Sequence, residues 1–174
     1  ELVNMLRPGD VVTHSYHGNT YGILDDAGRV MDGFKEARRK GVVFDVGHGA
    51  GSFSFDVAES ALSEGFYPGN ISSDIHIYNI EGPVFDQVTT ISKFMWLGMS
   101  LEDVVRLTTE STARLIGADG VGSLKAGSVG DATIMRRDEG RFILTDSVGR
   151  SVTANDKLVH VQTIKSGRVY RPWK

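Results

Sequence analysis

The stretch VVTHSYHG, residues 11–18, contains the pattern that decides the fold of this chain. Two β-branched apolar residues lead to a histidine between Gly9 and Gly18, which is typical of a short buried strand. The stretch VVFDVGHGAG, residues 42–51, repeats the pattern, and ISSDIH, residues 71–76, is a third example. We therefore predict three short strands, at residues 11–14, 42–46 and 71–73, each with a histidine or an aspartate at its carboxyl end.

Amphipathic segments lie between and after these strands. Their apolar spacing predicts helices over residues 31–40, 54–64, 84–97 and 100–116. The last of these opens with SLED, a capping box in which Ser100 and Asp103 satisfy the first backbone amides. Strands that alternate with helices favour parallel pairing through right-handed crossovers. The fold class is therefore α/β, either an open doubly wound sheet or a (β/α) barrel.

The tail of the chain has a different pattern. The stretches SLKAGSVGDATIMRR and KLVHVQTIKSGRVYRP combine strand alternation with turn residues. We therefore divide the chain into a (β/α) part, residues 1–118, and a small β-module, residues 119–174. His160 lies in the second of these stretches and is interpreted as a strand residue.

Composition excludes several classes of function. The net charge is −3, and the densest basic cluster, KEARRK at residues 35–40, contains a glutamate, so we expect no nucleic-acid partner. No run of eighteen apolar residues is present, so we expect no membrane partner and a cytoplasmic protein. The chain has no cysteine, which excludes disulfides, thiolate nucleophiles and cysteine zinc sites.

The residues that follow the three strands are the candidate site. In a parallel barrel the active site lies at the carboxyl ends of the strands, where we expect His14, His48 and Asp74. Imidazole and carboxylate together are suitable ligands for zinc and similar ions. Each residue also has a simpler interpretation, since a strand-end histidine often caps or faces solvent, and an aspartate often forms a turn. His17 and His76 are candidates for substrate binding or for a structural role.

Other catalytic and binding motifs are weak or missing. No G-x-S-x-G motif is present, which argues against a serine hydrolase of the nucleophile-elbow type. GAGSF, residues 49–53, is not a G-x-G-x-x-G, so a Rossmann-like binding protein is a poorly supported alternative.

Several stretches of the sequence resemble a known family. VGSLKAGSVGDATIM, residues 121–135, resembles the G-x-L-x-x-G-x-x-A-D-hydrophobic signature near the end of amidohydrolase-superfamily enzymes. The helix ending TTESTARLIGA before it, and TIKSGRVY at residues 163–170, fit the same region. LRPGDVVTHSYHGN, FDVGHGAGSFSF and YPGNISSDIH are most similar to the dihydroorotase-like amidohydrolase and deacetylase group.

The resemblance implies a (β/α)8 barrel of the TIM type followed by strands of a small β-sandwich. It implies one or two divalent ions, usually zinc, that activate a water molecule to hydrolyse a small-molecule amide or ester. The residue matching Asp74 would bind a metal and act as general base and then general acid. The residues matching His14 and His48 would hold the second metal, which polarises the scissile carbonyl.

Two expected features of the family are missing from this sequence. It has no His-x-His and no match to the strand-four lysine that the family carbamylates. We therefore expect the carboxyl half of a longer amidohydrolase, inactive or incomplete alone. Such a chain would form homo-oligomers or bind its missing half; a non-catalytic half-barrel is the alternative. The interval between His48 and Asp74 is short for the extra strand that the family has there. We expect either residues 52–55 or residues 65–69 to form a short seventh strand, or the barrel to be irregular.

Overall fold

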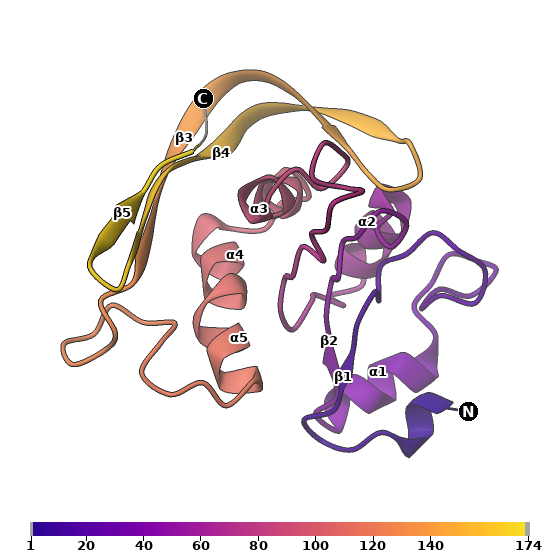
Figure 1. Cartoon of the computed structure of the whole chain (residues 1–174). Coiled ribbons are helices and arrows are strands. Elements are labelled where there is room, and N and C mark those ends of the chain that lie inside the picture. The colour runs from indigo at the N-terminus through magenta and orange to yellow at the C-terminus, as the bar shows by residue number, and fades with distance from the viewer. Residues whose placement is uncertain (1, 173–174) are drawn as a thin grey trace.

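The computed structural model describes residues 2–172 of the chain. A 3-10 turn, Leu2–Met5, precedes a region in which short strands and helices alternate, and three further strands follow (Figure 1). The elements in chain order are β1 Val11–Val12, α1 Asp32–Arg39, β2 Val43–Phe44, α2 Phe55–Ser63, α3 Gln87–Trp96, α4 Leu101–Thr108, α5 Glu110–Leu115, β3 Ala132–Thr145, β4 Ser151–Lys165 and β5 Arg168–Tyr170.

The first two strands are parallel, as the alternation of strands and helices predicted. Val11 pairs with Val43, and Val12 pairs with Phe44. The prediction of a third strand at residues 71–73 is wrong, because these residues form no regular strand. A single parallel bridge joins Asp45 to Asn70, just before them. Residues 52–55 and 65–69 do not form a strand either, so neither supplies the expected seventh strand.

The predicted helix over residues 100–116 is also wrong in one respect, because it is broken into α4 and α5. Thr109, at the break, has φ −126° and ψ −88°, which is not a helical conformation. The carbonyl of Leu107 accepts hydrogen bonds from the backbone N–H of Ile71 and from the Thr112 hydroxyl. It is therefore not available for the hydrogen bonds of a continuous helix. The predicted cap is present, since the Ser100 hydroxyl accepts from the Asp103 N–H at 3.1 Å.

The tail forms a long antiparallel hairpin. β3 pairs with β4, and β5 pairs with β4, with two irregularities in the β3–β4 register. The hairpin arches over α3, and its turn lies close to α2 (Figure 1). Trp96 donates its ring N–H to the Thr153 carbonyl at 3.1 Å, and Leu158 donates its N–H to the Ser92 hydroxyl at 3.0 Å. The predicted boundary at residues 118–119 falls in the loop before β3 and stays a prediction.

One apolar core joins these parts. It is built from aliphatic and aromatic side chains of the strands, loops and helices, and the fully buried aromatic members include Tyr16, Phe44, Phe53, Phe55 and Phe94. Leu144, Val152 and Leu158 of the hairpin belong to the same buried cluster, so the tail packs on the core directly. Among residues 2–172, none of the helices has the length and hydrophobicity that a membrane crossing requires.

Candidate functional site

Three segments lie side by side beyond the carboxyl ends of β1 and β2. The Ser15 N–H donates to the Asp45 carbonyl at 3.1 Å, and the His48 N–H donates to the Ser72 carbonyl at 3.2 Å. The segments that contain His14, His48 and Asp74 are therefore neighbours, as parallel pairing requires.

A buried carboxylate joins the three segments. Asp45 accepts hydrogen bonds from Thr13 Oγ1 at 2.6 Å, from Ser72 Oγ at 2.7 Å and from Asn70 Nδ2 at 2.7 Å. Its side chain is almost inaccessible to solvent, and a buried carboxylate requires donors of this kind. Asp45 therefore fixes the spacing of the segments on which the predicted site residues lie.

Two predicted site residues have an unusual backbone conformation. His14 has φ +58° and Asp74 has φ +47°, which is the left-handed region. Histidine and aspartate enter this region more readily than most residues, although it remains uncommon for any side chain other than glycine. These conformations turn the chain at His14 and at Asp74. Uncommon backbone geometry of this kind clusters at functional sites, which makes both residues candidates.

Glycines make room for the same two side chains. A Cβ on Gly47, which has φ +49°, would lie 2.6 Å from His14 Nδ1. A Cβ on Gly49, which has φ +53°, would lie 2.6 Å from Asp74 Oδ2. The positive φ of both glycines disfavours any other residue beside His48, and the Asp74 carboxylate lies against the His48 loop.

His14 is half-buried at the start of its loop. Its Nδ1 lies 2.7 Å from the Gly47 carbonyl oxygen, which can only accept, so we assign the proton to Nδ1. Its Nε2 is then the nitrogen with a free lone pair. Asp74 is exposed, and its backbone carbonyl accepts from the buried Asn79 side chain at 2.9 Å.

His48 is fully buried, and both of its ring nitrogens have partners. The ring stacks on Phe53 at 4.7 Å between centroids. Nδ1 lies 2.9 Å from the Gly49 carbonyl oxygen, and Nε2 lies 2.7 Å from Lys93 Nζ. Burial, and secondarily the charge of Lys93, lowers the pKa of His48 from 6.5 to about 4, so the ring is neutral near pH 7.

Lys93 is the site residue that sequence reasoning missed. It lies on α3, is fully buried, and donates to the Pro83 carbonyl at 2.7 Å as well as to His48. Burial lowers its pKa from 10.5 to about 7, although Asp146 and Asp86 oppose the shift. A signal was present in the sequence, because Lys93 is the only charged residue in QVTTISKFMWL, residues 87–97.

The remaining predicted histidines lie in local structures. His17 is half-buried and accepts at Nδ1 from the Asn19 N–H at 3.1 Å. His76 is exposed and accepts at Nδ1 from the Tyr78 N–H at 3.2 Å. Substrate binding by His17 and His76 stays a prediction. His160 lies in β4, which confirms that it is a strand residue.

The turn between β3 and β4 packs on the His48 loop. Ser147 Oγ donates to the Gly49 carbonyl at 3.0 Å. The buried Asp146 carboxylate accepts from the N–H of Phe55 at 2.9 Å, at the first residue of α2, and from the turn amides of Val148 and Arg150. The neighbouring N-cap residue Ser54 makes no side-chain cap bond, so the tail supplies the cap of a helix 91 positions away.

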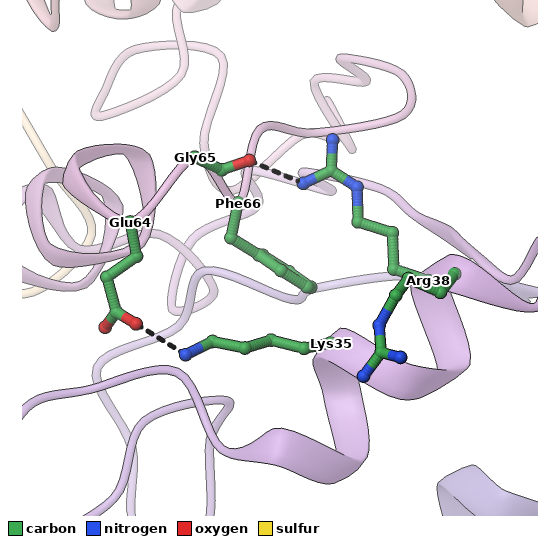
Figure 2. A pocket seen from close by; sticks show the side chains of 6 residues that line it. Lys35, Arg38, Glu64, Gly65 and Phe66 are labelled. Atoms are coloured by element: carbon green, nitrogen blue, oxygen red, sulfur yellow. Dashed lines mark hydrogen bonds and ion pairs between the residues drawn. The ribbon is translucent and has the colours of Figure 1, made fainter.

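A basic pocket elsewhere is a poor alternative site. It has a volume of about 380 Å³, lies between α1 and the end of α2, and contains none of the predicted site residues (Figure 2). Lys35 pairs with Glu64 at 2.6 Å, and Arg38 donates to the Gly65 carbonyl at 3.0 Å while its guanidinium covers the Phe66 ring. Lys35 and Arg38 therefore bind groups at the end of α2 and connect α1 to it.

Comparison with known proteins identifies relatives. A deacetylase of Enterococcus faecalis is 38% identical over 172 residues, which cover 98% of this chain and 47% of that protein. A deacetylase of Agrobacterium fabrum is 38% identical over 153 residues, covering 86% of this chain and 37% of that protein. The chain is related to the amidohydrolase superfamily. No family model matches it.

Solved structures agree with this relationship. An adenine deaminase superposes with a TM-score of 0.94 and 38% identity, covering 98% of this chain and 47% of that chain. A dihydroorotase superposes with a TM-score of 0.87 and 33% identity, covering 98% and 44%. The predicted carboxyl-terminal part of a TIM-type barrel in the amidohydrolase superfamily is therefore confirmed. The chain spans about half the length of the relatives it matches.

Proposed function

We propose that this chain is part of a hydrolase that cleaves an amide or ester bond of a small molecule in a deacetylase-like or dihydroorotase-like reaction. The relatives that carry the names deacetylase and dihydroorotase support the reaction class. The observation that carries the proposal is the placement of His14, His48 and Asp74 on three adjacent segments beyond parallel strands.

Asp74 is the residue to which we assign the proton transfers. It is the exposed carboxylate of the group, and its side chain lies against Gly49. A carboxylate in this position takes a proton from the attacking water and then gives it to the leaving nitrogen or oxygen. Asn79, which holds the Asp74 backbone carbonyl, keeps this loop in place.

The resemblance implies a divalent ion, with zinc as the expected metal, and one or two ions in the longer protein. The donors do not fit an ion as they are arranged here. Nε2 of His48 faces the Lys93 amine, and residues 2–172 contain no group of three His, Cys, Asp or Glu side chains placed to hold a metal. We therefore assign no reaction step to a metal.

The expected partners follow from the same proposal. The substrate is a small amide or ester, such as a cyclic amide or an N-acyl amino acid, and neither a nucleic acid nor a membrane is a partner. The net charge of −3, and the glutamate within the basic cluster at residues 35–40, argue against a nucleic-acid partner. We place the protein in the cytoplasm.

A second candidate is a non-catalytic half-barrel that binds another copy or the missing half. Apolar side chains near the site favour it: Ile77 is 80% exposed and Tyr78 is 86% exposed, both on the loop after Asp74. Val11 of β1, at the edge of the two-stranded sheet, is 46% exposed. An exposed apolar surface and an open strand edge are each typical of an interface.

One experiment separates these candidates. The 174-residue chain and the longer protein that contains it are assayed with N-acetylated amino acids and cyclic amides, and sedimentation gives the oligomeric state of each. We expect turnover by the longer protein and a loss of about 100-fold or more in Asp74→Asn, because general acid–base catalysis contributes that much. Asp26→Asn, an exposed aspartate in the 25–29 turn, is the matched control. Full activity in Asp74→Asn contradicts the assignment, and an inactive, self-associating protein supports the half-barrel.

A further inference from the structure

The fully buried amine of Lys93 faces the very nitrogen of His48 that a metal would need. A neutral imidazole has one nitrogen that donates and one that accepts. The Gly49 carbonyl can only accept, so the His48 proton is on Nδ1, 2.9 Å away, and the lone pair is on Nε2. That lone pair accepts from Lys93 Nζ at 2.7 Å.

A metal and this amine exclude each other. Zinc binds an imidazole nitrogen at about 2.0–2.1 Å through the same lone pair. Lys93 Nζ occupies that direction at 2.7 Å, and a protonated amine there would also repel a cation. An ion can therefore reach Nε2 of His48 only after Lys93 has moved.

The surroundings of Lys93 hold it in place. Its second hydrogen bond goes to the Pro83 carbonyl, in the loop that leads from Asp74 to α3. Among residues 2–172, no carboxylate forms an ion pair with Lys93. A buried lysine without such a partner is costly, and a residue of this kind is a candidate for a functional role.

We propose that Lys93 competes with a divalent cation for Nε2 of His48, and that it keeps this nitrogen closed to metal until the Lys93 side chain is displaced. The inference rests on the proposed function, because it concerns the ion that the family resemblance implies. It explains why the predicted ligands are adjacent and yet do not form a metal site among the described residues.

The test is a zinc titration of the 174-residue chain. Calorimetry measures the zinc affinity, and long-range ¹H–¹⁵N NMR monitors the imidazole nitrogens. In the unsubstituted chain we expect His48 to be the Nδ1–H tautomer and to keep its shifts when zinc is added. Lys93→Met should bind zinc about tenfold or more tightly through Nε2 of His48, since it removes the competing amine. Lys125→Met, at an exposed lysine in the loop before β3, is the matched control and should behave as the unsubstituted chain.

A double variant and a folding control make the result decisive. Lys93→Met combined with His48→Ala should lose the gain in zinc affinity. If circular dichroism shows that Lys93→Met does not fold, Lys93→Gln replaces it. Zinc binding to Nε2 of His48 with equal affinity in the unsubstituted chain and the variant overturns the proposal, and so does an Nε2–H tautomer before zinc is added. The titration measures no turnover, so its failure is distinct from an absence of hydrolysis by the longer protein.

Discussion

Replacing Asp45 with alanine should destabilise the chain substantially. The substitution removes the acceptor of three hydrogen bonds, from Thr13 and Ser72 at 2.6 and 2.7 Å and from the Asn70 amide at 2.7 Å. Hydroxyl groups can rotate toward other acceptors, but the buried Asn70 amide is left without one. An unsatisfied buried donor costs about 1–3 kcal/mol, and the bonds to a charged group add to this, so we expect a loss of about 3 kcal/mol.

Asp45→Asn should lower the free energy of unfolding by about half as much as Asp45→Ala, because most of the hydrogen bonds around position 45 can rearrange. Asn70 Oδ1 is buried and has no hydrogen-bond partner among the described residues. With an amide at position 45, a flipped Asn70 can accept through this oxygen, and one new hydrogen bond replaces part of what is lost.

The assay is urea unfolding of the 174-residue chain. With an m-value of about 2 kcal/mol/M, the midpoint of Asp45→Ala should fall by about 1.5 M. Asp26→Ala, at an exposed aspartate, is the control and should change the free energy of unfolding by less than about 0.5 kcal/mol. If Asp45→Ala unfolds at the same urea concentration and with the same m-value as the unsubstituted chain, Asp45 does not hold the three segments together.

Two other predictions concern stability. The pKa of His48 is lowered from 6.5 to about 4 and that of Lys93 from 10.5 to about 7, so both groups bind protons more readily in the unfolded chain. The free energy of unfolding should therefore rise with pH between about 4 and 6.5, and again from about 7 toward 10.5. Urea unfolding measured across this pH range should show both rises. In Lys93→Met, only the upper rise should disappear. Asp146→Ala removes the acceptor for the Phe55 N–H and for the turn amides, so it should cost about 2–3 kcal/mol in thermal or urea unfolding. An unchanged midpoint would show that the tail does not support α2.

Much of the local structure follows from short-range patterns. The apolar runs before His14 and His48 predict β1 and β2, and the helix patterns predict α1, α2 and α3 to within a few residues. These predictions work because strand and helix periodicity depends on neighbours in the sequence. The long helix failed at Thr109, because the Leu107 carbonyl is taken by Ile71, more than thirty positions earlier.

The sequence by itself determined that His14 and His48 follow short strands, which the structure has as β1 and β2. It determined the family through ordered motifs that cover nearly the whole chain. Both properties are local or linear, so no knowledge of packing was needed.

Only the tertiary structure decided what each of these side chains contacts. It placed Lys93 of α3 on His48, 45 positions away, and Asp146 of the tail on the first turn of α2. It also made Asp45, rather than a histidine, the group that joins the three segments. Hydrogen bonds of this kind depend on distances set by the packed core, and the periodicity of a sequence contains no information about them.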